Sequence, residues 1–275
     1  SGLGFVPLAT DAVFCGLIDD DEGWSPGKGV GIGTTKLVIP LIRPVYELVV
    51  REIRRDDELV LSYPFAFGAR IAQDHLGIPV WTVHPSAWLF QSIKDTQVYP
   101  RVNMRALAQG RLRRVAYSAI DRVTGLLAGD PEANPKFAVS RRRPAWARQL
   151  ARTAFGRLGD LMFAGPVNAL REEIGLPPVK GILTSWCHSP LRNVGLFPDW
   201  FAIPQTDWPP RHLLTGFVFA ADDGGGPDEG LQRFLERGPA PVVFTFGSEK
   251  RANREAFDEA LAACTELGAR GVFVS

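Results

Sequence analysis

The sequence predicts an α/β protein built on parallel β-sheets. One pattern occurs twice along its 275 residues: a short apolar run, an amphipathic helix that ends at a glycine, and a second apolar run. This order of strand, crossover helix and strand is typical of parallel α/β sheets. The runs are apolar along nearly their whole length, which favours a sheet covered on both faces.

The first copy of the pattern begins with the apolar run at residues 59–63. Gly77 ends the helix that follows, and residues 79–83 form the next apolar run. The apolar stripe of this helix has helical spacing and consists of Phe67, Ile71, Ala72 and Leu76. We therefore expect a complete βαβ unit between residues 59 and 83.

The second copy begins with the apolar run at residues 241–246. Gly268 ends its helix, and residues 271–274 form the last strand. The stripe on this helix consists of Phe257, Leu261, Cys264 and Leu267. A second βαβ unit is therefore predicted at the end of the chain.

A glycine-rich acidic run at residues 222–229 separates the two copies and indicates a linker. A strand is predicted before it at 213–219, a short helix after it at 231–237, and a further strand at 4–8. We divide the chain into an N-terminal unit at 1–220, a linker with a short helix at 221–240, and the start of a second unit at 241–275. A piece of under about 40 residues seldom folds alone. We therefore expect an internal part of a longer two-domain protein.

Composition excludes several classes of protein. Lys and Arg total 31 against 30 Asp and Glu, and 45% of residues are hydrophobic, which excludes a disordered chain or a coiled coil. No window of 18 apolar residues lacks a charge, so no membrane-spanning helix is predicted. The 3 cysteines are widely spaced, which favours a reducing compartment. We expect a cytoplasmic protein, located either free in the cytoplasm or at the inner face of the membrane.

The positive charge is concentrated between Arg101 and Arg157, where thirteen Lys or Arg residues face three acids. Such a segment forms a solvated face or makes peripheral contact with an anionic membrane or lipid. The arginines expected to make that contact are Arg111, Arg113, Arg114, Arg141, Arg142 and Arg143. No zinc-finger spacing, RNA-binding signature or basic zipper accompanies them, so nucleic acid is not an expected partner.

Two positions at the ends of predicted strands are candidate ligand sites. His84 follows the strand at 79–83, and open α/β sheets bind ligands at the carboxyl ends of their strands. His84 is therefore expected either to line a ligand pocket or to be an ordinary loop residue. Gly247 and Ser248 follow the strand at 241–246 and precede a helix, an arrangement that suits a phosphate. The alternative is that Ser248 simply caps the helix.

Other motifs point to no site. The glycine-rich run at 27–33 has no preceding strand, and the acidic run at 19–22 fits a solvated loop. The sequence contains neither a G-x-S-x-G elbow nor an H-E-x-x-H motif, and His75 is predicted on a helix surface. We predict no metal.

Four segments in collinear order carry a family resemblance: residues 186–190, 196–210, 214–217 and 241–248. Together they resemble GT-B glycosyltransferases of the family 1 and family 28 type. The resemblance is greatest to rhamnosyltransferases of rhamnolipid synthesis and next to sterol glucosyltransferases. The most specific parts are the Phe-x-x-Pro-Gln-x-Asp-Trp-Pro run that begins at Phe201 and the Phe-Thr-Phe-Gly-Ser strand end at 244–248.

The resemblance implies a GT-B fold, in which a Rossmann-like acceptor domain faces a Rossmann-like donor domain. Here it implies the acceptor domain and the first βαβ unit of the donor domain. It also implies an inverting hexosyltransferase that uses a UDP- or dTDP-sugar without a metal or other cofactor and glycosylates a hydrophobic, lipid-like acceptor. Mapped by motif, Gly247 and Ser248 contact the donor. The residues that line the acceptor side are Phe65, Phe67, Gly68, His84, Pro85 and Ser86.

The sequence departs from the family pattern at both ends. The strand and glycine-rich loop that bring the family's catalytic base would precede Ser1, and its His- and Gly-rich donor motif would follow Ser275. The catalytic base is therefore unknown, and the chain by itself is expected to be inactive. The alternative is a non-catalytic lipid-binding module with the acceptor-domain fold. A nicotinamide-dependent oxidoreductase is disfavoured, because no G-x-G-x-x-G follows a strand.

Overall fold

The computed structural model describes residues 4–10, 13, 16, 33–53, 58–90, 92, 144–219, 228–245 and 254–274. The chain divides into two compact units, Ser1–Val218 and Phe219–Ser275. Each unit is described by itself below.

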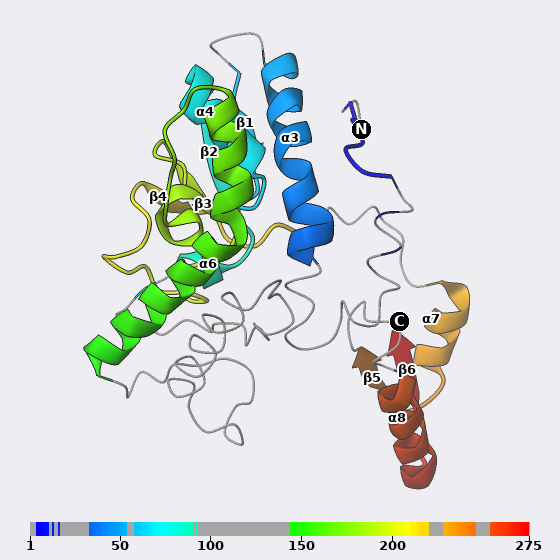
Figure 1. The fold of residues 1–275 in the computed structure, drawn as a ribbon. Helices are drawn as coiled ribbons and strands as arrows, with labels where there is room; N and C mark the ends of the chain where they lie inside the picture. Colours follow the sequence, from blue (N-terminus) through cyan, green and yellow to red (C-terminus); the bar gives the residue numbers. More distant parts are fainter. Residues whose placement is uncertain are drawn as a thin grey trace, which may run out of the picture. The chain divides into compact units, whose positions relative to one another are not determined.

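The first unit is built on a four-stranded parallel sheet (Figure 1). Its strands lie side by side in chain order: β1 (Val60–Ser62), β2 (Val80–His84), β3 (Asn193–Gly195) and β4 (His212–Leu214). The register pairs Ser62 with Thr82, Thr82 with Asn193, and Asn193 with His212. The predicted α/β class with a parallel sheet is confirmed, and the sheet is compatible with a Rossmann-like fold.

Among the described residues, three α-helices accompany this sheet: α3 (Ile39–Glu52), α4 (Phe67–Leu76) and α6 (Ala145–Glu173). Shorter turns are the π-helices η1 (Thr34–Val38) and η4 (Ile182–Trp186) and the 3-10 helix η2 (Ala87–Leu89). Helix α4 connects β1 to β2, as predicted, and ends at Gly77 with φ of 70°. Only glycine adopts this left-handed conformation at little cost.

The main core lies among α3, α4, α6 and η4. Its centre is Phe67, whose ring meets that of Phe163 edge to face at 5.1 Å between centroids. Gly68, in the first turn of α4, lets this helix approach α3 closely, because a Cβ atom at this position would overlap the backbone of Ile42 and Tyr46. A second cluster around Val49, Ala72 and Val80 continues the core toward the sheet.

The two faces of the sheet are buried unequally. Along β2, Val80, Thr82 and His84 are buried, whereas Trp81 and Val83 are only half-buried. On the face of Trp81 and Val83, Leu61 is 66% and Leu213 44% exposed. Strand β3, in contrast, is buried at all three of its positions. Among the described residues, the predicted cover on both faces is therefore observed at β3 and is incomplete at β1 and β4.

The second unit contains the predicted βαβ element. Strand β5 (Val242–Thr245), helix α8 (Arg254–Leu267) and strand β6 (Gly271–Val274) follow one another, and β5 pairs with β6 in parallel. Before them, helix α7 (Glu229–Glu236) is capped by Asp228, whose Oδ1 accepts hydrogen bonds from the backbone N–H groups of Gly230 and Leu231.

Two predicted strands differ from the structure, and two observed elements were not predicted. Residues 4–8 form no strand, although they are apolar, because no described segment pairs with them. The strand predicted at 213–219 is observed as β4, which starts at His212 and already ends at Leu214. Helix α6 and strand β3 were not anticipated. The arginines of α6 resembled a solvated run, and β3 is only three residues long.

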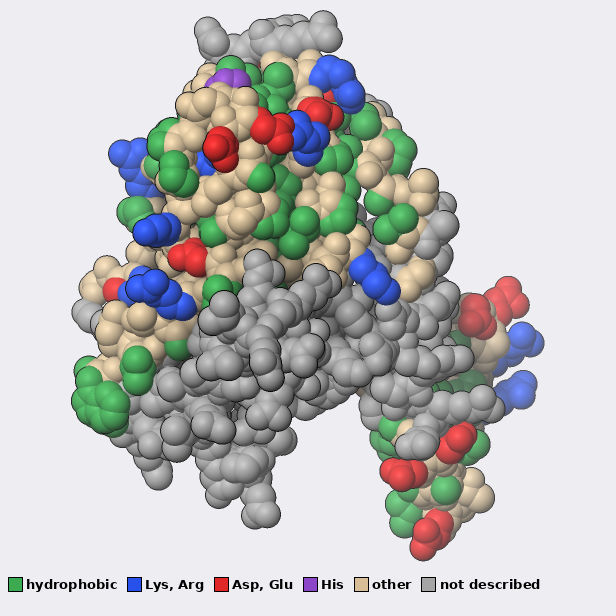
Figure 2. All heavy atoms as spheres, viewed as in Figure 1, with side chains coloured by type: hydrophobic (Ala, Val, Ile, Leu, Met, Phe, Trp, Pro, Cys, Tyr) green, Lys and Arg blue, Asp and Glu red, His purple; other side chains and the backbone are tan. Residues whose placement is uncertain are grey.

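The surface of the described residues carries both signs of charge. In the view of Figure 2, Lys and Arg side chains alternate with Asp and Glu over the first unit. None of the described helices combines the length and the apolar character needed to span a bilayer.

The close approach of α3 and α4 at Gly68 leads to a stability prediction. Gly68→Ala should lower the free energy of unfolding by about 1–3 kcal/mol, because the new methyl group meets backbone atoms that have no room to move. The matched control is Gly165→Ala in α6, where no atom outside its chain neighbours and its own helix backbone lies within 4 Å of the Cβ position. The following Pro166 disfavours a Cβ atom at this helical position, whereas alanine has the higher helix propensity, so this change should cost less than Gly68→Ala. Urea unfolding that gives equal losses of free energy for the two variants would contradict the packing argument.

Candidate functional site

The carboxyl ends of the four strands form one edge of the sheet, where open α/β proteins bind ligands. Three exposed aromatic residues follow β3 and β4 at this edge: Trp200 (74% exposed), Phe201 (56%) and Phe217 (39%). Their ring centroids lie 5.3 to 6.3 Å apart, so they form a single cluster, which we call the aromatic patch. It offers a solvent-facing apolar surface for a ligand.

The structure separates the predicted acceptor residues into two aromatic clusters. Phe65 contacts Phe67 and Phe163 in one of them, and Phe67 is fully buried. Gly68 packs against α3. His84 belongs to the other cluster, where its ring lies 4.5 Å from that of Phe90.

Pro85 and Ser86 directly follow β2 and are exposed. Of the six predicted acceptor residues, Pro85, Ser86 and the half-buried Phe65 are therefore the ones accessible from solvent. Their role in binding an acceptor remains a prediction.

The predicted donor residues Gly247 and Ser248 lie outside the described residues, although β5, which leads to them, is described. The six arginines predicted to contact a membrane also lie outside the described residues, as do the acidic run at 19–22 and most of the glycine-rich run. The roles proposed for these residues remain predictions.

His84 is paired in the interior with a second histidine that the sequence did not connect to it. The His84 and His188 rings lie 5.1 Å apart. Burial is the main cause that lowers the pKa of His84 to about 2, and the neighbouring His188 adds to the effect. Burial is also the main cause that lowers the pKa of His188 to about 4, and the positive charges of Arg152 and Arg70 add to it. Asn193 favours the protonated His84 ring, but is not in hydrogen-bonding geometry with it. Both rings are therefore neutral at physiological pH.

Because no part of its ring is exposed, His84 cannot take a proton from a ligand at the sheet edge in this conformation. The nearby Cys187 thiol is also unreactive, since burial raises its pKa to about 12. Within the described ranges, no group of three His, Cys, Asp or Glu side chains is placed to hold a metal ion.

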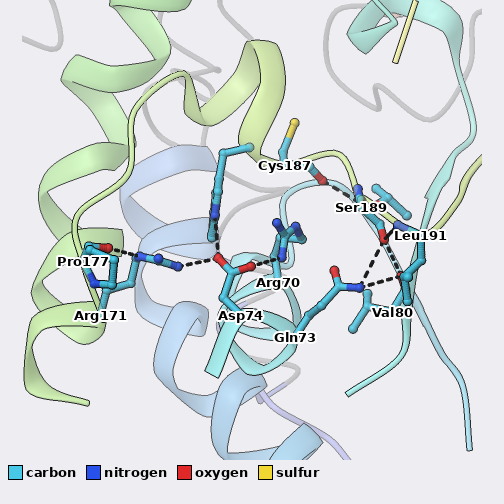
Figure 3. Close-up of polar contacts among 11 residues, drawn as sticks. Arg70, Gln73, Asp74, Val80, Arg171, Pro177, Cys187, Ser189 and Leu191 are labelled. Atoms are coloured by element: carbon cyan, nitrogen blue, oxygen red, sulfur yellow. Dashed lines mark hydrogen bonds and ion pairs between the residues drawn. The ribbon is translucent and has the colours of Figure 1, made fainter. Parts of the chain in front are cut away.

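Asp74, near the end of α4, is the centre of a polar network in the first unit (Figure 3). Its carboxylate accepts hydrogen bonds from Arg70 Nη1 and Arg171 Nη1, each at 2.6 Å, and from Trp186 Nε1 at 2.9 Å. Burial alone would raise the pKa of Asp74, but the Arg70 charge and these three hydrogen bonds hold it below its usual value. The guanidinium groups of Arg70 and Arg171 also lie over the Trp186 ring, 5.4 and 5.6 Å from its centroid.

A second network fastens the segment after η4 to β2. Ser189 donates from its hydroxyl to the Val80 carbonyl at 2.6 Å, and its backbone N–H donates to Thr82 Oγ1 at 3.0 Å. Gln73 donates to both Val80 O and Ser189 Oγ at 3.3 Å. Figure 3 shows that these bonds run from α4 to the strand and on to the segment that leads into β3. Sequence reasoning missed both networks, because none of their polar residues forms a recognisable spacing.

Comparison with known proteins gave no match to a protein-family model and none to a curated protein sequence.

The Asp74 network leads to a prediction about stability. Asp74→Asn should lower the free energy of unfolding by about 3 kcal/mol or more, because it leaves two largely buried guanidinium groups without their counter-charge. The control is Glu173→Gln, which removes the partner of Arg43 in an exposed pair and should change the melting temperature little. Equal melting temperatures for the two variants would refute the role assigned to Asp74.

The paired histidines predict a loss of stability in acid. Their folded-state pKa values lie below the ordinary value of 6.5, so their contribution is complete above pH 6.5. It declines as the pH falls toward 4, because only the unfolded chain takes up protons there. The free energy of unfolding should fall by up to about 1.4 kcal/mol per pH unit for each ring.

Urea unfolding between pH 7 and 4 would measure this slope. His84→Leu should reduce the slope, whereas His75→Gln, which changes an exposed histidine on α4, should not. A wild-type protein whose unfolding free energy is constant over this range would contradict the argument.

Proposed function

We propose that this chain is part of an inverting glycosyltransferase of GT-B architecture. In this proposal, the first unit holds a hydrophobic, lipid-like acceptor and the second begins the binding site for a UDP- or dTDP-sugar. The aromatic patch at the carboxyl ends of β3 and β4 is the observation that carries the proposal. Trp200 and Phe201 belong to the segment that carries the strongest resemblance to these enzymes.

The patch has the chemistry that an apolar acceptor needs. Trp200 and Phe201 leave more than half of their surface in water, which is costly unless a ligand or another protein surface covers it. A hydrocarbon chain or a fused ring that covered three aromatic rings would gain about 25 cal/mol for each Å² of apolar surface removed from water. Hydrogen-bonding groups at the edge, such as the exposed Ser86 hydroxyl, would orient the acceptor's polar end.

In the second unit, β5 leads directly to Gly247 and Ser248 and α8 follows them. A glycine permits close approach of a diphosphate to the backbone, and the serine hydroxyl can donate a hydrogen bond to it. Transfer with inversion also needs a base that deprotonates the acceptor hydroxyl. His84 is too deeply buried for this role in the described conformation, so the proposal assigns no base to the described residues.

The alternative is a lipid-binding module without catalytic activity. The same aromatic patch favours it, because apolar binding requires no donor site. The two functions differ in whether the chain binds a nucleotide diphosphate.

Separate substitutions at the two predicted sites test the proposal. Trp200→Ala and Phe217→Ala should each weaken binding of 3-hydroxydecanoate by about fivefold or more, because each removes a large part of the apolar surface. Gly247→Val should weaken binding of UDP or dTDP and leave the hydroxy acid unaffected. Trp146→Ala is the matched control, since Trp146 is 69% exposed on α6 and lies outside the patch.

Isothermal titration calorimetry with both ligands would measure these effects. Binding of the hydroxy acid without either nucleotide would favour the lipid-binding module. A wild-type chain that binds neither ligand would overturn both functions.

A further inference from the structure

A pocket of about 550 Å³ lies in the first unit, on the side of the sheet covered by the Asp74 network. Its walls come from α4, α6 and the segments that precede β3 and β4, and include Arg70, Arg152, Ser189 and Pro209. It shares no residue with the aromatic patch. The inference that follows goes beyond the proposed glycosyltransferase function and does not depend on it.

The charges around this pocket do not balance. Three cations line it, Arg70, Arg152 and Lys180, against one acid, Asp207, which already accepts a hydrogen bond from Ser92 at 2.7 Å. Arg152 and Lys180 form no ion pair with any described residue. The local potential therefore favours an anion.

Arg70 does not remove this imbalance through its ion pair. The single carboxylate of Asp74 is shared between Arg70 and Arg171, so one positive charge remains uncompensated in the network. Within the Arg70 guanidinium, Nη1 is bonded to Asp74, whereas Nε is buried and has no hydrogen-bond partner. A planar guanidinium with free N–H groups is well suited to carboxylate or phosphate oxygens.

Two further buried nitrogens on residues that line the pocket also lack partners, Trp208 Nε1 and His188 Nδ1. Trp208 is 6% and His188 7% exposed. The indole N–H and the guanidinium N–H can only donate. The neutral His188 ring has one donor and one acceptor nitrogen, so it does not decide the kind of ligand. A buried donor without an acceptor costs about 1–3 kcal/mol, so the unpaired donors Arg70 Nε and Trp208 Nε1 favour an acceptor that comes from outside the chain.

We propose that this pocket binds the oxyanion of a small molecule, a phosphate or a carboxylate group. Arg70, Arg152 and Lys180 supply the charge, and the enclosed Trp208 indole N–H donates a hydrogen bond after a small rotation of its side chain toward the pocket. The body of the ligand lies against Leu89, Val179 and Pro209, which give the pocket an apolar wall. The volume suits a metabolite-sized ligand.

Calorimetric titration with inorganic phosphate and with benzoate, at constant ionic strength, tests this site. We expect at least one of the two to bind with a dissociation constant in the millimolar range or below. Arg152→Gln should weaken that binding fivefold or more and Lys180→Gln about twofold to threefold. Neither side chain takes part in the Asp74 network, so both variants should melt at the wild-type temperature.

The matched control is Arg237→Gln, which removes the same charge from the second unit and should leave binding unchanged. Preference for phosphate would indicate a phosphorylated ligand, and preference for benzoate a carboxylate on an apolar body. In ¹⁵N-resolved spectra, the indole N–H signal of Trp208, assigned with Trp208→Phe, should shift on titration. The inference is overturned if neither anion binds, or if Arg152→Gln and Arg237→Gln bind equally well.

Discussion

The carboxylate of Asp74 is the contact on which the first unit depends. It joins residues from three parts of the chain: Arg70 on its own helix α4, Arg171 near the end of α6, and Trp186 at the end of η4. Burial of these groups depends on the carboxylate, which accepts a hydrogen bond from each of them and offsets one of the two positive charges. The network positions α6 and η4 against α4, and these elements supply most of the core around Phe67. Of these elements, η4 also leads into the segment that precedes β3.

How much of this arrangement the sequence predicts differs between elements. The helix at 67–76 was predictable because its apolar stripe and its glycine stop are local signals, and both are observed. Asp74 is preceded by Gln73 and followed by His75, so in sequence it looks like part of a solvated helix face. Its partners lie about 100 residues away, at Arg171 and Trp186, and no local periodicity records a contact at that separation. Helix α6 was missed for a related reason, because its arginines resembled a solvated stretch.

His84 shows where position along a strand is insufficient. The sequence correctly places it at the carboxyl end of a strand, at the edge where ligands bind. The side-chain direction depends on the two-residue period, which puts His84 on the same face as Val80 and Thr82, toward the interior. The apolar strand gave no indication of which face would be covered by Phe90 and His188. The position of His84 at the end of a strand was therefore predictable, whereas the burial of its side chain was not.

Arg70 contributes both to the Asp74 network and to the pocket that we propose binds an oxyanion. Arg70 is fixed by Asp74 through one nitrogen, and its side chain also lines the pocket. Fixing the guanidinium in advance reduces the entropy lost when an anion binds, so a rigid network supports affinity as well as structure. An anion that binds only the folded chain stabilises it by mass action, and would compensate the charge that Asp74 leaves unbalanced. Ligand binding and the packing of α4 against α6 are therefore coupled through Arg70.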